Sequence, residues 1–197
     1  MSNFNWEKYQ FIDHLNVKKH EVNNLPKGVI ISTMCASCKD GLGTNINTDN
    51  ILKYMQLNNN DIISVKRNAE NMRSLIPPKV RKRKTKKVKE KKSGAMFFHQ
   101  ITVVVRVNEG PFQNLEDEAK INFKIFKNGS IQMSGIKKIS YLNKALNKLL
   151  YRLRSVLAIR DKKTGKIEEI NFLENSNDLT VRNFKIDMIN SNYQVNM

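Results

Sequence analysis

The residue types that usually carry catalysis are few in this 197-residue sequence, and they form no catalytic pattern. The three histidines, His14, His20 and His99, lie in unrelated sequence contexts. No serine elbow, Walker-type phosphate loop or paired-carboxylate motif occurs. We therefore expect a protein that is not an enzyme, with no catalytic residues and no cofactor.

Cys35 and Cys38 form the one metal-like pattern in the sequence. A structural zinc site needs four ligands, and no second cysteine pair exists. We therefore interpret both residues as small members of a buried strand, with zinc as the minor alternative, and expect no metal. Thr164-Gly165-Lys166 resembles the end of a phosphate-binding loop, but it lacks the upstream glycine and the following helix, so a turn is expected there.

Binding chemistry is more evident in residues 121–135, where two alternating runs flank Asn128-Gly129. An Asn-Gly pair in this setting predicts a β-hairpin. One face of both runs is apolar. The other face mixes amides, hydroxyls, Lys124 and Phe126. A face that only meets water does not need Phe126, although single exposed aromatic residues are common.

The rest of the chain predicts an antiparallel sheet covered by helices on one side. The helices expected are a short one over residues 48–57, capped by Asn47 or Thr48, and a long one over residues 140–156, capped by Ser140. The long helix has a broad apolar stripe and should cover the core face of the sheet. Further strands are expected at residues 28–38, 62–67, 98–107 and 184–193.

The face of the sheet opposite the helices should then stay open, and it defines the candidate site. Its expected members share an amide, hydroxyl or apolar character with cations at the edge. They are Val29, Ile31, Thr33, Gln100, Thr102, Val104, Arg106, Asn122, Lys124, Phe126, Ser130, Gln132 and Ser134, with Phe98 on the same face as Gln100.

This mixture suits the DNA minor groove. Base edges there offer hydrogen-bond acceptors, apolar side chains can wedge between base steps, and cations can meet phosphates. An RNA-binding sheet of the RRM type would need two or three aromatic residues on its strands. Phe126 and Phe98 are the ones available. The residues therefore favour DNA.

The charge of the chain also points to a polyanion. There are 35 Lys and Arg against 18 Asp and Glu, which gives a net charge of +17. Nucleic acid or an anionic membrane surface is the kind of partner implied. No apolar run approaches the roughly 18 residues of a spanning helix, and the first residues lack a signal-peptide pattern. An intracellular protein with no membrane partner is expected.

Residues 77–94 concentrate the positive charge, with Lys82, Arg83 and Lys84 at their centre. Such a block repels itself and should stay disordered until it meets an anion. It is typical of a nuclear-localisation or nucleic-acid-binding patch. A solvated loop that only aids solubility is the alternative.

Three segments resemble motifs of a known family. Ile125–Gly135 looks like the segment "IF-x-x-G-K-M-x-x-TG" of the TATA-box-binding protein family, Ile101–Val107 looks like its "VIMRI" strand, and Val29–Thr33 looks like its "NIVAT" strand. The sequence KNGSIQMSG and the basic insertion most resemble the divergent TATA-binding-like proteins of nucleocytoplasmic large DNA viruses. The resemblance covers roughly residues 28–157.

The resemblance implies roles for individual residues. Phe126 falls on a wedging phenylalanine, Arg106 on a phosphate-contacting arginine and Ser134 on a groove-contacting threonine. Ile31 falls on a groove valine. The sequence also departs from the family: Val29 replaces a base-reading asparagine, Lys124 replaces an apolar groove residue, and Gln100 stands where a second wedging phenylalanine is expected.

The fold implied is α+β, a curved antiparallel sheet with helices on its convex face, as one full repeat and the start of a second. Three regions are expected: an accessory helix or arm over residues 1–27, the repeat over residues 28–157, and a linker with the first strand of a second repeat over residues 158–197. Either the chain is a fragment, or two chains pair to rebuild a saddle, or the protein has moved to another role.

The function implied is a transcription initiation factor that binds double-stranded DNA through its concave sheet face. A transcription factor IIB-like protein, RNA polymerase and a second copy of the chain are the implied protein partners. The host nucleus, a cytoplasmic viral factory or the virion are the implied locations. The alternative is a non-specific basic protein that packages DNA, or a structural protein of the virion.

Overall fold

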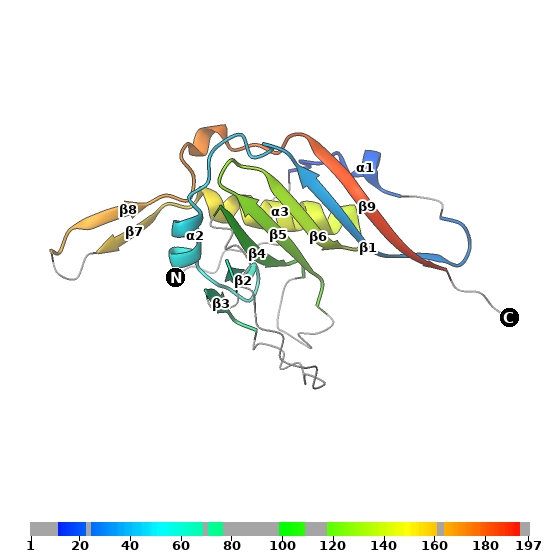
Figure 1. Cartoon of the computed structure of the whole chain (residues 1–197), viewed down its shortest axis with the longest axis horizontal. Helices are drawn as coiled ribbons and strands as arrows, with labels where there is room; N and C mark the ends of the chain where they lie inside the picture. Colours follow the sequence, from blue (N-terminus) through cyan, green and yellow to red (C-terminus); the bar gives the residue numbers. More distant parts are fainter. Residues whose placement is uncertain are drawn as a thin grey trace, which may run out of the picture.

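The computed structural model describes residues 12–22, 25–68, 71–76, 99–108, 118–160 and 164–193. Within them, seven strands form one antiparallel sheet in the order β3-β2-β4-β5-β6-β1-β9, and two more form a separate hairpin (Figure 1). The sheet strands are β1 (Val29–Cys38), β2 (Ile62–Lys66), β3 (Met72–Ser74), β4 (Gln100–Arg106), β5 (Lys120–Phe126), β6 (Ile131–Ile136) and β9 (Phe184–Tyr193).

The hairpin predicted from Asn128-Gly129 is confirmed and joins β5 to β6. Gly129 has a φ of 79°, and its N–H donates to the Phe126 carbonyl at 3.0 Å. A Cβ built on Gly129 would lie 2.5 Å from the Thr44 carbonyl oxygen. Glycine is therefore required here both by the backbone conformation and by the close approach of the neighbouring loop.

The long helix α3 (Ile139–Arg154) packs on one face of this sheet (Figure 1). Its buried leucines join the inward-facing side chains of the strands in one core cluster. Phe123 and Ile125 of β5 belong to the same cluster and are fully buried. The helix begins one residue before the predicted cap, since Lys138 rather than Ser140 occupies the N-cap position. The sheet therefore has one covered face, as the apolar stripe predicted.

The short helix α2 (Thr48–Tyr54) is held at both ends. The Asn50 N–H donates to the side-chain oxygen of Asn47 at 3.0 Å, which confirms the predicted cap. At the other end, Arg73 of β3 donates to the carbonyls of Leu52 and Met55 at 2.6 and 2.7 Å. Arg73 thus satisfies carbonyls that the last turn of a helix leaves without partners. Strand β3 was not predicted from the sequence.

Basic residues of α3 hold the turn before β2. Lys148 is fully buried, and its ammonium donates to the carbonyls of Asn60, Arg106 and Val107 at 2.8, 3.2 and 3.1 Å. One turn further on, Arg152 pairs with buried Asp61 at 2.5 Å. These contacts fix α3 to the end of β4 and to the turn at residues 58–61.

The N-terminal segment lies along the outer side of α3. The amide side chains of Asn143 and Asn147 both donate to the Ile12 carbonyl, at 3.0 and 2.9 Å, and Leu15 is buried in the core. Helix content in residues 12–22 is limited to α1 (Val17–His20). An accessory helix or arm was expected over residues 1–27, and the described residues 12–16, 21, 22 and 25–27 are not helical. Residues 1–11, 23 and 24 lie outside the described residues. No helix in the described residues is long and apolar enough to cross a membrane.

The segment after α3 differs from its prediction as a polar linker. It forms a hairpin of β7 (Leu157–Arg160) and β8 (Ile167–Ile170), followed by a 3-10 turn, η2 (Ser176–Asp178). The hairpin extends away from the sheet beside α2 (Figure 1). Each strand is only four residues long, so alternation was too short to recognise. Strand β9 then returns and pairs with β1 along the whole length of both strands.

Candidate nucleic-acid interface

The face of the sheet opposite α3 carries two side-chain rows that cross all seven strands. Residues directly opposite each other in antiparallel strands point to the same side of the sheet, so the strand registers define each row. The first row is uncharged and contains Ser74, Ser64, Val104, Asn122, Ser134, Cys35 and Met188. The second contains Met72, Lys66, Thr102, Lys124, Gln132, Ser37 and Lys185.

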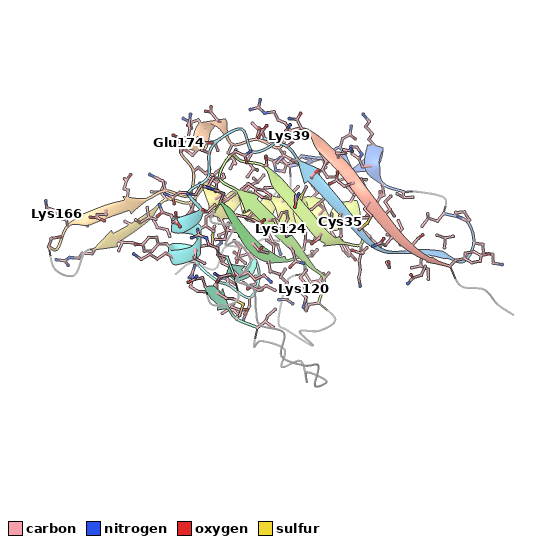
Figure 2. All side chains as sticks on the ribbon, in the orientation of Figure 1. Cys35, Lys39, Lys120, Lys124, Lys166 and Glu174 are labelled. Carbon is pink, nitrogen blue, oxygen red and sulfur yellow. The ribbon has the colours of Figure 1, made fainter. Side chains whose placement is uncertain are left out.

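The two rows of this face differ in exposure. In the second row Lys66, Lys124 and Lys185 are exposed, while Thr102 is 9% exposed. In the first row Asn122 and Ser134 are half-buried, whereas Ser64 and Val104 are buried. Figure 2 shows Lys124 and Cys35 near the middle of this face. Amide and hydroxyl groups at the centre are therefore accompanied by lysines that can reach beyond them.

Phe126 lies one step further along β5, beside the second row. It pairs directly with Gln100 of β4, and both side chains are half-buried. Its backbone N–H donates to the Ser130 carbonyl at 3.0 Å, which fixes it next to the β5–β6 turn. An aromatic ring is thus held next to the β5–β6 turn, at one end of a surface that is mostly polar.

One curated protein is similar to this chain over most of its length. It is described as TATA-box-binding protein-like, from Acanthamoeba polyphaga mimivirus, and it is 34% identical over 165 residues, which are 84% of this chain. The match confirms the predicted resemblance to the TATA-box-binding protein family. The chain spans about two fifths of the length of that relative, since 41% of the relative is covered. No protein-family model matches the chain, and no solved structure matches it.

The α+β class predicted from the sequence agrees with the observed antiparallel sheet and helices. Most of the expected site residues do lie together on the open face. The members that the structure places there are Thr33, Gln100, Thr102, Val104, Asn122, Lys124, Phe126, Gln132 and Ser134. Phe98, Lys82, Arg83 and Lys84 lie outside the described residues, as does the basic insertion over residues 77–94.

The expectation that Val29 and Ile31 lie on the open face is wrong. Ile31 packs against the core, and both residues line a groove next to Ile139 at the start of α3. The register between β1 and β9 shifts between Ile31 and Thr33, so one extra residue is inserted there. Such a bulge reverses the alternation of faces on one side of it. Counting alternate residues back from Thr33 therefore assigns Ile31 to the wrong face of the sheet.

Arg106 is also placed differently from its expected phosphate contact. It is 1% exposed, and its guanidinium donates to both carboxylate oxygens of Glu118 at 2.6 and 2.8 Å. A third bond runs to the Asn59 carbonyl at 3.0 Å. The hydrogen bond from Arg106 also lowers the pKa of the Glu118 carboxyl. In this structure Arg106 is a buried structural residue and does not present a cation to the surface.

Ser130 is the remaining member of the expected site, and the two cysteines were expected as small residues of a buried strand. The Ser130 hydroxyl donates to Asp40 at 3.1 Å and accepts from the Asp40 N–H at 2.9 Å, so it stabilises the neighbouring loop. Cys38 is buried, and burial raises its pKa to about 12, which keeps the thiol protonated. Cys35 lies on the open face opposite Ser134. Among the described residues no cluster of three or more His, Cys, Asp or Glu could hold a metal.

The expected face did not include four residues of the second row, which are Met72, Lys66, Ser37 and Lys185. Lys66 ends a strand that was predicted, and Lys185 lies near the start of another. Their alternation was visible, but their common row depends on strand order and register. Neither can be derived from one strand at a time.

Proposed function

We propose that this chain is a non-enzymatic, DNA-binding transcription initiation factor that contacts the minor groove through its open sheet face. The observation that carries the proposal is the face opposite α3, which gathers amides, hydroxyls, exposed lysines and a half-buried Phe126. The name of the mimivirus relative supports the same family of function. Because the chain covers only 41% of that relative, the activity suggested by the relative's name is proposed, and not established, for this chain.

In this proposal the first row lies over the base edges. Asn122 and Ser134 are directly paired, and their amide and hydroxyl can donate to the acceptors that every base pair shows in the minor groove. Phe126 wedges between base steps at the end of the contact and kinks the duplex. The basic insertion adds affinity that depends on salt.

The proposed partners follow from the family resemblance. They are double-stranded DNA, a transcription factor IIB-like protein and RNA polymerase. In this proposal β9 is the first strand of a second repeat. The remaining strands of that repeat come either from the same protein or from a second copy of it. The proposed location is the host nucleus or a viral factory, with packaging in the virion as a further destination.

Fluorescence anisotropy with an AT-rich and a GC-rich duplex, across a salt series, tests the proposal. Minor-groove contact predicts a preference for the AT-rich duplex that survives moderate salt, because the exocyclic amine of guanine obstructs the groove floor. Equal binding of both duplexes that disappears with salt would leave the cations as the whole cause of binding and would reject groove readout.

Phe126→Ala provides the matched test of the wedge. We expect the variant to lose most of the DNA bend, measured by energy transfer between dyes at the duplex ends, because no other described side chain can replace the ring at that position. Lys166→Ala, at an exposed position of the β7–β8 turn and outside both rows, serves as the control and should retain the bend. Unchanged bending by Phe126→Ala would remove the wedge role.

A second candidate function is non-specific DNA packaging by a structural protein of the virion. It is favoured by the net charge of +17 and by the concentration of cations in residues 77–94. Deleting that block should then abolish DNA binding, while substitutions on the open face should have no effect. If DNA binding survives the deletion but is lost on substitution of the open face, the result supports the proposal of an initiation factor.

A further inference from the structure

Lys124 lies between Asn122 and Phe126 on the outward side of β5. These three residues alternate with Phe123 and Ile125, which are fully buried on the α3 side, so all three face outward from the open face. Lys124 is exposed, whereas Asn122 and Phe126 are half-buried. Strand β5 is the fourth of the seven strands in the sheet, and Figure 2 shows Lys124 near the middle of the face. A cation therefore projects from the centre of this surface.

The ammonium group of Lys124 is available for a ligand. In the part of the chain that the structure describes, this side chain forms no ion pair and no hydrogen bond. Its direct neighbours on β4 and β6 are Thr102 and Gln132, which are uncharged. An ammonium group donates three hydrogen bonds and accepts none. A ligand that lies over the centre of the open face must therefore offer acceptors to Lys124.

The proposed function fixes how β5 lies relative to the groove. It places Asn122 over base edges and Phe126 between base steps of the same minor groove. The two residues are four positions apart on β5, which is about 13 Å, whereas the groove is about 6 Å wide. Strand β5 must therefore run along the groove and not across it. Ser134 on the neighbouring strand, about 4.8 Å from Asn122, still lies within the width of the groove.

Lys124 then lies over the floor of the groove, because both of its outward neighbours on β5 do. An A·T pair shows only acceptors there, which are adenine N3 and thymine O2. A G·C pair adds the exocyclic amine of guanine, which is a donor and obstructs the floor. An ammonium group is therefore favoured over A·T pairs and disfavoured over G·C pairs.

We propose that Lys124 is a specificity residue whose ammonium group enters the minor groove and donates to base acceptors between the Asn122 contact and the Phe126 wedge. The inference rests on the proposed function and adds the residue that rejects guanine at this position. A lysine that contacts a phosphate, in contrast, binds all sequences equally, because phosphate contacts do not read bases.

The test uses two duplexes that differ only in the exocyclic amine of guanine. One is GC-rich, and the other has inosine in place of every guanine. Inosine lacks that amine, so an inosine–cytosine pair shows only acceptors in the minor groove, as an A·T pair does. Lys124→Met removes the charge and keeps a side chain of similar length. Lys124→Arg keeps a cation that only donates hydrogen bonds.

Lys66→Met is the matched comparison. Lys66 is exposed on the same face and carries the same charge, but β2 lies two strands from β5, which is about 10 Å. A groove that follows β5 is about 6 Å wide, so Lys66 lies outside it. Lys66 is therefore placed for contacts that do not read bases.

The measured quantity is the ratio of the affinities for the inosine duplex and the guanine duplex, from fluorescence anisotropy at one moderate salt concentration. Lys124→Met should lower this ratio by about fivefold or more, which is the low end of the cost of one unfavourable base pair. Lys124→Arg should keep the wild-type ratio. Lys66→Met should weaken binding of both duplexes by the same factor. Any difference in flexibility between the duplexes cancels, because every variant is measured on the same pair.

The possible failures have different meanings. If Lys124→Met weakens binding of both duplexes equally, or changes neither affinity, Lys124 does not read bases and the inference is wrong, while the DNA-binding function stands. If the wild-type chain binds the two duplexes equally and also shows no preference for an AT-rich duplex, groove readout is absent. The proposed function and this inference are then both wrong.

Discussion

Some polar side chains of this protein are buried and stabilise the sheet, whereas others are exposed on its surface and can bind a partner. Arg106 and Lys124 make the contrast clear, because they are the two cations of the face that the sequence predicted. Arg106 is enclosed with Glu118, whereas Lys124 is exposed in the middle of the open face. A guanidinium that already makes a two-pronged ion pair has little to gain from a phosphate.

The Arg106–Glu118 pair gives the first prediction. Glu118→Ala leaves a buried guanidinium without its carboxylate, and breaking such a pair costs about 3–5 kcal/mol. We expect the free energy of unfolding in urea to fall by about that amount. Asp49→Ala is the control, because Asp49 pairs with Arg67 at 2.8 Å but is 65% exposed. An exposed pair contributes less than about 1 kcal/mol. Similar losses in the two variants would contradict the structural role of Arg106.

The same pair predicts a dependence on pH. The pKa of Glu118 is lowered in the folded protein by the hydrogen bond from Arg106. A carboxyl with a lowered folded pKa stabilises the protein fully above its unfolded pKa, and this contribution is lost as the pH falls through the folded value. The stability difference between wild type and Glu118→Ala should therefore be largest near neutral pH and shrink in acid. Urea midpoints measured from pH 7 down to pH 3 check this, and a constant difference would contradict it.

At the scale of elements, the polar contacts of α3 set its position as firmly as its leucines do. The helix brings Lys148 and Arg152 to the turn at residues 58–61, next to the end of β4. The same turn receives Arg106 from β4. Three cations from two elements thus bind two carbonyls of one short loop and the carboxylate of Asp61, which is fully buried and needs a partner.

Lys148→Met tests this arrangement. The substitution leaves the carbonyls of Asn60, Arg106 and Val107 without the donor that joins them. Each buried group that loses its partner costs about 1–3 kcal/mol, so we expect a loss of at least about 3 kcal/mol in the free energy of unfolding. Lys144→Met, one turn earlier on the exposed side of α3, should change stability by less than about 0.5 kcal/mol. A wild-type urea midpoint for Lys148→Met would reject the role of the buried ammonium.

The elements that the sequence predicted well are those with long and regular patterns. The β5–β6 hairpin, α3 and β9 were expected within one or two residues of their observed bounds. Strands β3, β7 and β8 were missed, since three or four residues cannot establish a period. The face predicted for Ile31 was wrong because of the bulge at Ser32. That bulge arises from the pairing of β1 with β9 and cannot be seen in the sequence of β1 alone. The partner of Arg106 was missed because Glu118 lies twelve residues away across a chain reversal.

At the scale of the whole molecule, the sheet is continuous from β3 to β9, while the β7–β8 hairpin stands apart from it (Figure 1). The open face depends on that continuity, because its two rows need every strand in register. The hairpin adds no residue to either row. Its core contacts come from its base, where Leu157 and Ile170 pack against the main cluster.

This difference predicts that the hairpin can be removed without loss of the fold or of DNA binding. Leu157 and Ile170 are directly paired, so a short Gly-Ser linker can replace residues 158–169 and join them. We expect the free energy of unfolding to change by less than about 1 kcal/mol, because an isolated two-stranded ribbon is at best marginally stable. The affinity for duplex DNA, measured at a fixed salt concentration, should also equal that of the wild-type chain.

Met188→Asp supplies the contrasting change within the sheet. Met188 ends the uncharged row at β9 and pairs with Cys35, and it is 46% exposed. A carboxylate there should leave the fold intact but weaken duplex binding, because it places a negative charge beside the phosphates. Fluorescence anisotropy titrations of duplex DNA with the hairpin deletion and with Met188→Asp show which element contacts the DNA. Weaker binding after removal of the hairpin, with Met188→Asp unaffected, would place the nucleic-acid contact on the hairpin and not on the sheet.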